Sequence, residues 1–243
     1  MSTQQAESRP LAGRIALVTG ASRGIGAATA QALAADGAHV VLTARSATDL
    51  EAVEDAIHAA GGSATIAPLD LIDGENIGRL AQALSGRWSA LDILVLNAAT
   101  LGSLAAVPAI DSKEFARQFT LNVAAQQALI AAFDPMLRAS KDARVVALTS
   151  GVAAASPRAY WGAYGASKAA LEVLVAAYGQ EVRNISAIRT HIVEPGATRT
   201  AMRARAYPGE DPATLKTPDV VGRAIADLVA SDVPDGHLLT LPK

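Results

Sequence analysis

Two ionisable side chains, Tyr164 and Lys168, stand four positions apart in the run Tyr-Gly-Ala-Ser-Lys. On a helix this spacing places both on one face, where an ammonium group favours ionisation of a phenol. A free tyrosine has a pKa of about 10 and exchanges protons poorly at neutral pH, so a neighbouring cation suits it for acid–base work. An exposed pair on a helix surface is the alternative interpretation of the same spacing.

A serine, Ser150, lies fourteen positions before Tyr164 and directly after an apolar run. Its hydroxyl can hydrogen-bond a carbonyl oxygen and stabilise the charge that develops there. Thr149 is the nearest rival for this role, and an ordinary turn residue is the alternative interpretation.

Three glycines follow the apolar run 15–18, at Gly20, Gly24 and Gly26 in Thr-Gly-Ala-Ser-Arg-Gly-Ile-Gly. Their spacing differs from the dinucleotide fingerprint G-x-G-x-x-G. Glycine lets a backbone approach a ligand closely, and a helix that follows offers free N–H groups to a phosphate. A tight turn that needs positive φ is the alternative.

The composition favours small-molecule chemistry. With 243 residues and 51% hydrophobic content, the chain can bury a large core in one α/β domain. A net charge of −2 gives no reason to expect nucleic acid or an anionic membrane as partner. The chain has no cysteine, which excludes disulfides and is compatible with the cytoplasm. Its four histidines are scattered without ligand spacing, so we expect no metal.

Short apolar runs alternate with longer helical patterns. The strands are predicted over 15–19, 40–43, 64–68, 93–96, 145–149, 190–193 and 238–241. The helices are predicted over 24–36, 48–60, 74–87, 112–140, 163–184 and 217–230. Most strands lack polar–apolar alternation, as expected for strands covered on both faces. The pattern predicts a Rossmann-like, doubly wound parallel sheet of seven strands with helices on both faces.

We interpret residues 11–243 as one dinucleotide-binding domain and the polar stretch 1–10 as a disordered tail. The eighteen uncharged residues 93–110 contain Asn97, Gly102 and Pro108, so they predict a strand and a loop rather than a membrane span. The stretch of about 196–218 is too long for a tight connection and is interpreted as a substrate loop.

Several motifs together resemble the short-chain dehydrogenase/reductase family. They are the glycine stretch, Asn-Ala-Ala at 97–99, Asn122, Ser150, Tyr-Gly-Ala-Ser-Lys at 164–168 and Pro-Gly-Ala-Thr-Arg-Thr at 195–200, in that order. The resemblance covers roughly residue 13 to the end. It implies an oxidoreductase that transfers hydride between a nicotinamide dinucleotide and a carbonyl or alcohol. It also implies a homodimer or homotetramer, for which the alanine-rich helix 163–184 offers an apolar surface.

The resemblance implies which residues bind the cofactor: Gly20, Ser22, Arg23, Gly24, Ile25, Gly26, Arg45, Asp70, Leu71, Asn97, Ala98, Ala99, Tyr164, Lys168, Pro195, Gly196, Thr198 and Thr200. Asp70 and Leu71 would lie by the adenine, and Thr198 and Thr200 near the carboxamide. Arg45 stands nineteen positions after Gly26, where an acidic residue would favour NAD.

A guanidinium at position 45 can pair with a 2′-phosphate, and Arg23 could approach the same group, so NADP(H) is favoured over NAD(H). Two solvated surface arginines are the alternative interpretation.

The resemblance also implies catalytic roles. Tyr164 would protonate the carbonyl oxygen, Lys168 would hold the nicotinamide ribose, Ser150 would stabilise charge and Asn122 would help organise a water relay. A polar helix residue satisfied by backbone or water is the alternative for Asn122.

Substrate contacts have two interpretations each. The apolar residues Leu101, Trp161, Met202 and Tyr207 could line the site or belong to the core. Similarly, Arg199, Arg203 and Arg205 could attract an anionic substrate, although a solvated helix face is favoured.

Two departures from the family pattern appear. The separation between Ser150 and Tyr164 is one residue longer than usual, and Ala99 stands where glycine is common. A catalytically silent dinucleotide sensor or scaffold is the alternative function, against which the retention of Ser150, Tyr164 and Lys168 argues.

Overall fold

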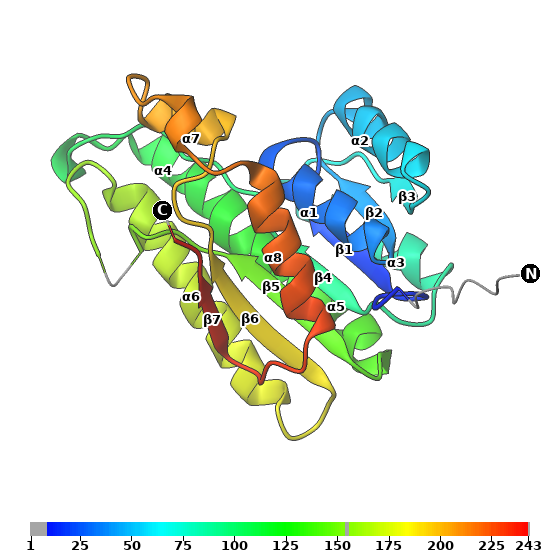
Figure 1. Ribbon diagram of the computed structural model, residues 1–243. Coiled ribbons are helices and arrows are strands. Elements are labelled where there is room, and N and C mark those ends of the chain that lie inside the picture. The colour runs from blue at the N-terminus through cyan, green and yellow to red at the C-terminus, as the bar shows by residue number, and fades with distance from the viewer. Residues whose placement is uncertain (1–8, 154–155, 243) are drawn as a thin grey trace, which may run out of the picture.

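A parallel sheet forms the centre of the fold (Figure 1). The computed structural model describes residues 9–153 and 156–242, so the predicted tail lies outside the described residues up to residue 8. Within this part there are seven strands: β1 Ile15–Thr19, β2 His39–Thr43, β3 Ser63–Ile66, β4 Ile93–Leu96, β5 Ala143–Leu148, β6 Ile188–Glu194 and β7 His237–Thr240. They pair in the order β3-β2-β1-β4-β5-β6-β7, all parallel, which confirms the predicted fold class.

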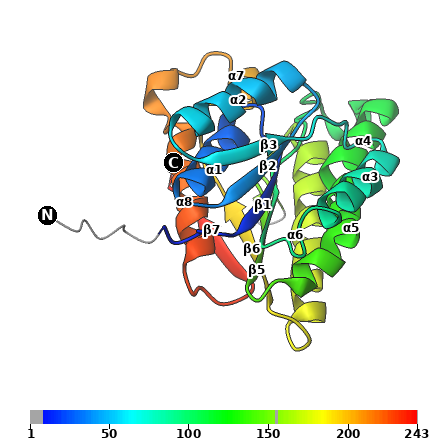
Figure 2. The same ribbon diagram turned by 90° about the vertical axis from the view of Figure 1, so that its right-hand side faces the viewer.

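Helices cover both faces of the sheet. They are α1 Gly24–Ala35, α2 Ala47–Ala59, α3 Gly74–Ser85, α4 Ser112–Phe119, α5 Ala125–Ala139, α6 Gly162–Val182, α7 Ala201–Ala206 and α8 Pro218–Ala230. Figure 2 shows α3, α5 and α6 on one side of the sheet and α1 and α8 on the other. Within residues 9–153 and 156–242, no helix combines the length and the apolar character that crossing a bilayer requires.

The strands are apolar because both of their faces are buried. Alternate residues of β5 face opposite layers: Val146 and Leu148 pack with α1, α2 and α8, whereas Val145 and Ala147 pack with α3, α5 and α6. All residues of β4 and β5 are buried, but the residues of the edge strand β7 alternate between half-buried and exposed. This sandwich explains why the central strands β4 and β5 are continuous apolar runs, whereas the edge strands β3 and β7 are partly exposed.

Two segments differ from the predicted elements. The single helix expected over 112–140 contains a π-helical turn, Thr120–Ala124, between α4 and α5. The expected loop 196–218 contains α7 and a short 3-10 turn, Pro212–Thr214. Neither feature has a periodicity long enough to be recognised in sequence, since α7 spans only six residues.

The turn between β1 and α1 explains its glycines. Gly20 and Gly24 have φ of +65° and +58°, a region that side chains other than glycine rarely adopt. Gly26 is needed for a different reason, because a Cβ there would overlap the Gly20 carbonyl oxygen and lie 2.5 Å from Asn97 Nδ2. The first two glycines therefore shape the turn, and the third lets α1 pack against it.

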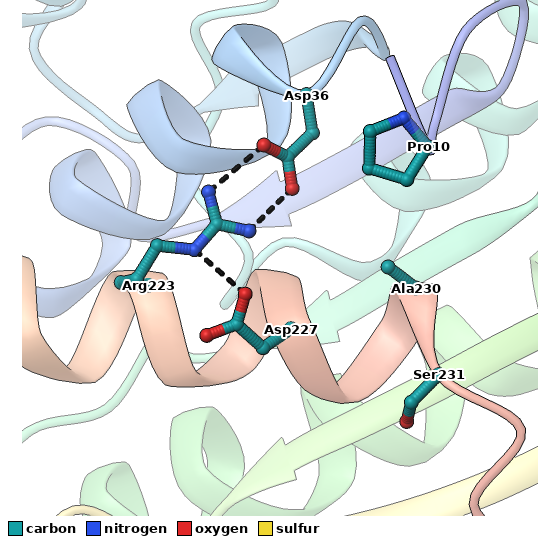
Figure 3. Close-up of a pocket in the computed structure, with 6 residues that line it drawn as sticks. All are labelled: Pro10, Asp36, Arg223, Asp227, Ala230 and Ser231. Atoms are coloured by element: carbon teal, nitrogen blue, oxygen red, sulfur yellow. Dashed lines mark hydrogen bonds and ion pairs between the residues drawn. The ribbon is translucent and has the colours of Figure 1, made fainter. Parts of the chain in front are cut away.

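An ion-pair group joins the two helices of one layer at the end of the sheet away from the glycine turn. Arg223 of α8 contacts both carboxylate oxygens of Asp36, the residue that ends α1, with one Nη1–Oδ1 distance of 2.8 Å. Its Nε donates to Asp227 at 2.9 Å (Figure 3). These contacts lie beside Pro10 and fix the C-terminal end of α1 against α8.

We predict that Gly26→Ala lowers the free energy of unfolding by about 1–3 kcal/mol, because the added methyl group must displace backbone. Urea unfolding measures the change. The matched control is Gly78→Ala in the exposed face of α3, where an added Cβ meets no atom within 4 Å. This change should stabilise the protein by about 0.5–1 kcal/mol, as expected when alanine replaces glycine inside a helix. Equal stabilities of the two variants would contradict the packing argument.

His191 of β6 is fully buried, and neither of its ring nitrogens has a hydrogen-bond partner in the described part of the chain. Burial, together with the positive charge of Arg144, lowers the pKa of His191 to about 4. The folded state therefore binds fewer protons than the unfolded state at mildly acidic pH. Protonation of His191 must consequently oppose folding.

We predict that stability falls as the pH decreases from about 6.5 towards about 4, and that His191 accounts for up to about 3 kcal/mol of the loss. His191→Leu should flatten this part of the pH dependence, whereas His58→Leu, at an exposed position, should retain it. Urea unfolding of the three proteins between pH 7 and pH 4 provides the comparison. Identical pH slopes for the wild type and His191→Leu would refute the assignment.

Candidate active site

The predicted site residues gather at one edge of the sheet. Turns after β1, β4, β5 and β6 all lie at the carboxyl ends of parallel strands. Chain order reverses between β1 and β4, because β2 and β3 extend from one side of this pair and β5 to β7 from the other. Ligands of open α/β sheets bind in the crevice at such a switch point.

Asn97 holds the glycine turn in place. Its Nδ2 donates to the carbonyl oxygens of Thr19 and Gly20, at 2.8 and 3.2 Å. The backbone N–H groups of Asn97 and Ala98 each donate to Thr19 Oγ1 at 3.0 Å. Asn97 was predicted to bind the cofactor. In this state its amide ties the turn after β4 to the turn after β1, which is a structural role.

The start of α1 fits an anion. Arg23 is its N-cap residue and makes no side-chain cap hydrogen bond, so the first N–H groups of the helix are not capped by that side chain. Ser22 and Ile25 are half-buried beside it, and Arg23 is exposed. Free N–H groups and the helix dipole favour a phosphate at this position.

Residues expected near the adenine and its ribose lie after β2 and β3. Arg45 is exposed after β2. Asp70 is half-buried and accepts the Ile72 N–H at 3.1 Å. The side chain of Leu71 belongs to the buried core under α3, so the backbone of this residue is the part left for ligand contact.

Tyr164 and Lys168 lie at the start of α6 with their side chains buried. Lys168 Nζ is 5.9 Å from the centre of the Tyr164 ring and donates to the Leu148 carbonyl oxygen at 2.8 Å. Burial raises the pKa of Tyr164 to about 12 and lowers the pKa of Lys168 to about 8. The expected facing pair is present, but in this state burial dominates the pKa of the phenol.

The two candidate hydroxyls after β5 have different partners. The Ser150 side chain acts on the Tyr164 phenol and lowers its pKa, against the effect of burial. Thr149 is buried and donates its hydroxyl to the carboxylate of Glu172. The structure therefore brings Ser150, and not Thr149, to the tyrosine. The longer spacing between Ser150 and Tyr164 includes residues 154 and 155, which lie outside the described residues.

Asn122 lies in the π-helical turn and is fully buried. Its Nδ2 donates to the Thr100 carbonyl oxygen at 2.9 Å and to Ser167 Oγ at 3.0 Å, and its Oδ1 accepts the Thr100 N–H at 2.8 Å. The amide of Asn122, which was expected to organise water, thus forms these hydrogen bonds with protein groups. In this arrangement Asn122 fixes the segment after β4 to α6, directly beside Lys168.

Apolar side chains surround the tyrosine. Leu101, Val152 and Tyr164 form a small buried cluster, against which Leu104, Trp161, Met202 and Ala206 pack. The Tyr164 hydroxyl donates to Met202 Sδ at 3.8 Å. Of the apolar residues singled out in the sequence, Leu101, Trp161 and Met202 therefore lie at the tyrosine and not in the two large cores.

The segment that contains α7 covers this cluster. The ring of Tyr207 stacks on Trp161 at 5.7 Å, and the Arg203 guanidinium lies 3.8 Å from the centre of the Tyr207 ring. Arg203 also pairs with Glu210 through two contacts, of which Nε–Oε2 measures 2.6 Å. Arg199 and Arg205 are exposed. The three arginines thus do not form one cluster, since Arg203 pairs with Tyr207 and Glu210 in the segment that covers Tyr164. We call this segment, residues 201–210, the cover.

The turn after β6 returns to the glycine turn. Gly196 has φ of +63°, and Thr198 Oγ1 donates to the Pro195 carbonyl oxygen at 3.2 Å. Thr200 caps α7 by accepting the Arg203 N–H, and its methyl carbon lies 3.5 Å from the position of a Cβ built on Gly24. The predicted residues after β1 and β6 are therefore neighbours in space.

One acidic residue of this region was not among the predicted ones. Glu172 lies one helical turn beyond Lys168 and contacts Thr149. The spacing of four between Lys168 and Glu172 was the available signal. As for metals, the described residues contain no group of three or more histidine, cysteine or acidic side chains that could hold an ion.

Comparison with known proteins agrees with this geometry. The family model described as short chain dehydrogenase matches residues 14–211. An uncharacterized oxidoreductase of Escherichia coli K12, YciK, is 38% identical over 208 residues, which are 84% of this chain and 81% of the relative. A 3-oxoacyl-[acyl-carrier-protein] reductase of rhamnolipid biosynthesis in Pseudomonas aeruginosa is also 38% identical, over 85% of this chain and 80% of its own.

Solved structures match over nearly the whole chain. A short chain dehydrogenase from Pseudomonas syringae is 37% identical, with a TM-score of 0.92 and 99% coverage of both chains. Another, from Escherichia coli CFT073 and complexed with NADPH, is 34% identical, with a TM-score of 0.91 and coverage of 96% and 98%. The sheet order, the motifs and these similarities lead to one conclusion: the chain is a member of the short-chain dehydrogenase family of oxidoreductases.

Proposed function

We propose that this protein is an NADP(H)-dependent oxidoreductase that interconverts an apolar carbonyl compound and its alcohol. The observation that carries the proposal is the convergence of Tyr164, Ser150 and Lys168 beside apolar side chains, at the carboxyl edge of the sheet. A proton donor, a hydrogen-bond partner and a cation at one point are the groups that carbonyl reduction needs.

The residues present fit a nicotinamide dinucleotide. The turn after β1 leaves no room for side chains at Gly20 and Gly26, and the N-terminus of α1 suits the pyrophosphate. When bound, the cofactor supplies or accepts the hydride. Short chain dehydrogenases of similar structure were solved with NADP and with NADPH, which supports the same choice here.

The remaining cofactor contacts follow from the same placement. We assign the pyrophosphate to the residues at the start of α1, the adenosine to residues after β2 and β3, and the nicotinamide side to residues after β4 and β6. These are Ser22, Arg23, Ile25, Arg45, Asp70, Leu71, Asn97, Ala98, Ala99, Pro195, Gly196, Thr198 and Thr200. Arg45 and Arg23 are exposed cations, as a 2′-phosphate requires.

The proton-transfer roles follow from the positions of the hydroxyls. Tyr164 donates its phenolic proton to the carbonyl oxygen during reduction and recovers it during oxidation. Ser150 hydrogen-bonds the same oxygen as negative charge develops. The ammonium of Lys168 stabilises the phenolate that remains, and Asn122 keeps the neighbouring backbone in place.

The substrate is expected to present an apolar body to the tyrosine. The apolar side chains of Leu101, Leu104, Trp161 and Met202 pack at the tyrosine, and the Tyr164 hydroxyl donates to Met202 Sδ. A carbonyl oxygen that approaches Tyr164 must therefore displace the Met202 sulfur. A long unbranched thioether can adopt another rotamer at small cost.

Turnover distinguishes this proposal from a dinucleotide-binding sensor or scaffold. NADPH oxidation is followed over a panel of ketones, aldehydes, quinones and β-keto acyl compounds. Consumption with apolar carbonyls supports the proposal. Saturable NADPH binding without oxidation over the whole panel would favour the sensor.

We also propose a homodimer or homotetramer, in the cytoplasm. On α6, Val173 is 69% exposed and is flanked by the exposed Ala176 and Ala177, an apolar surface suited to a second copy. Light scattering at several concentrations measures the mass. The compartment remains a prediction from the absence of cysteine.

We predict that Tyr164→Phe removes most turnover, about a hundredfold or more, because the transferable proton is lost while the ring is kept. NADPH affinity should stay close to that of the wild type. Lys168→Ala should impair both. Cofactor titration and single-turnover hydride transfer separate the two effects.

Tyr178→Phe is the matched control, since it removes a buried hydroxyl from the same helix, where it donates to Asp134 at 2.7 Å. It should leave hydride transfer unchanged. Near-normal chemistry in Tyr164→Phe would eliminate this residue as the acid.

We predict that Arg45→Asp weakens NADPH by roughly ten- to a hundredfold and affects NADH much less, because a charge-assisted contact with phosphate is replaced by repulsion. Dissociation constants of both cofactors are measured at one fixed ionic strength, because salt screens exposed contacts. Arg87→Asp, an exposed change of equal charge beyond the C-terminus of α3, is the control and should leave the ratio of the constants unchanged. A constant ratio in Arg45→Asp would remove the principal support for NADP(H).

A further inference from the structure

Glu172 is a half-buried acidic residue on the face of α6 that carries Lys168. Its carboxylate accepts the hydroxyl hydrogen of Thr149, which is 5% exposed. A carboxylate away from bulk solvent needs such a partner, because desolvation disfavours its charge. The roles proposed above use neither Glu172 nor Thr149.

The contact joins α6 to the end of β5 beside a second contact of the same kind. Lys168 donates to the carbonyl oxygen of Leu148, and Glu172 accepts from the next residue, Thr149. The residue after that is Ser150, whose side chain acts to lower the pKa of Tyr164. Leu148, the last residue of β5, and Thr149, the residue after it, are thus tied to two successive turns of the helix, which fixes the position of Ser150 relative to Tyr164.

Charge provides a second link. Burial lowers the pKa of Lys168 to about 8, and the negative charge of Glu172 acts against this shift. The ring of Tyr164 on α6 also faces the ammonium, and Asn122 bonds to Ser167, the residue before Lys168. On the adjacent strand, Glu194 of β6 faces Gly151 and acts on Lys216.

We propose that Glu172 is a positioning residue of the active site, which holds the Ser150-bearing end of β5 through Thr149 and supplies the counter-charge of Lys168. The proposal rests on the roles proposed for Tyr164, Ser150 and Lys168. Its two parts are separable, because one depends on a hydrogen bond and the other on charge.

Glu172→Gln separates the two parts, because glutamine keeps an oxygen acceptor for Thr149 and removes the charge. The pH midpoint of Lys168 should move down by about one unit. NMR of ¹⁵N-lysine-labelled protein without cofactor measures it, with the signal identified by its loss in Lys168→Arg. The pH above which turnover in the reduction direction declines should fall by the same amount.

Thr149→Val tests the hydrogen bond with the charge retained. We expect kcat to fall about tenfold, with the Lys168 midpoint unchanged and NADPH affinity near that of the wild type, because Ser150 is displaced from Tyr164. Thr149→Ser keeps the hydroxyl and should restore kcat.

Glu181→Gln, an exposed change of equal charge on the same helix, is the matched control and should alter neither readout. An unchanged Lys168 midpoint in Glu172→Gln would overturn the charge role. An unchanged kcat in Thr149→Val would overturn the positioning role. The NMR titration requires no turnover, so an inactive wild type would count against the proposed function while the charge role is still tested.

Discussion

The buried ammonium of Lys168 sets a constraint that much of this site satisfies. A charge 2% exposed to solvent is costly unless polar groups surround it, and here the Leu148 carbonyl accepts from it directly. That contact requires the start of α6 to lie over the end of β5. Ser167, the residue before Lys168, is held in turn by Asn122 from the π-helical turn. Burial of one cation thus determines how strand, helix and π-turn meet.

The glycine turn obeys a different constraint, which is space. Asn97 occupies the volume that side chains at Gly20 or Gly26 would need, and its amide fixes the two strand ends β1 and β4 together. Hydrogen bonds therefore hold the two strand ends at the switch point together without any ligand. Such preorganisation lowers the cost of binding, because little of the backbone must still be ordered.

The sequence predicted most of the fold, because the strands are short apolar runs buried on both faces and the connections are long enough to be helices. Tyr164, Lys168 and the glycines were also recognisable, because several family-like motifs occur together and in one order along the chain. The choice between Ser150 and Thr149 was not, because it depends on which way each hydroxyl points at a strand end. The partners of Asn122 come from distant segments, and Leu71 is buried by a helix, so no local pattern indicated these contacts.

The cover over Tyr164 belongs to one connection between β6 and α8. Its side chains meet Trp161 and one another, and they take no part in the pairing of the strands. Proton transfer and cofactor contacts are carried mainly by strand ends and by α6. The cover is thus a module in the evolutionary sense: a descendant can exchange this single segment and acquire a new substrate range while it inherits the sheet and its chemistry intact.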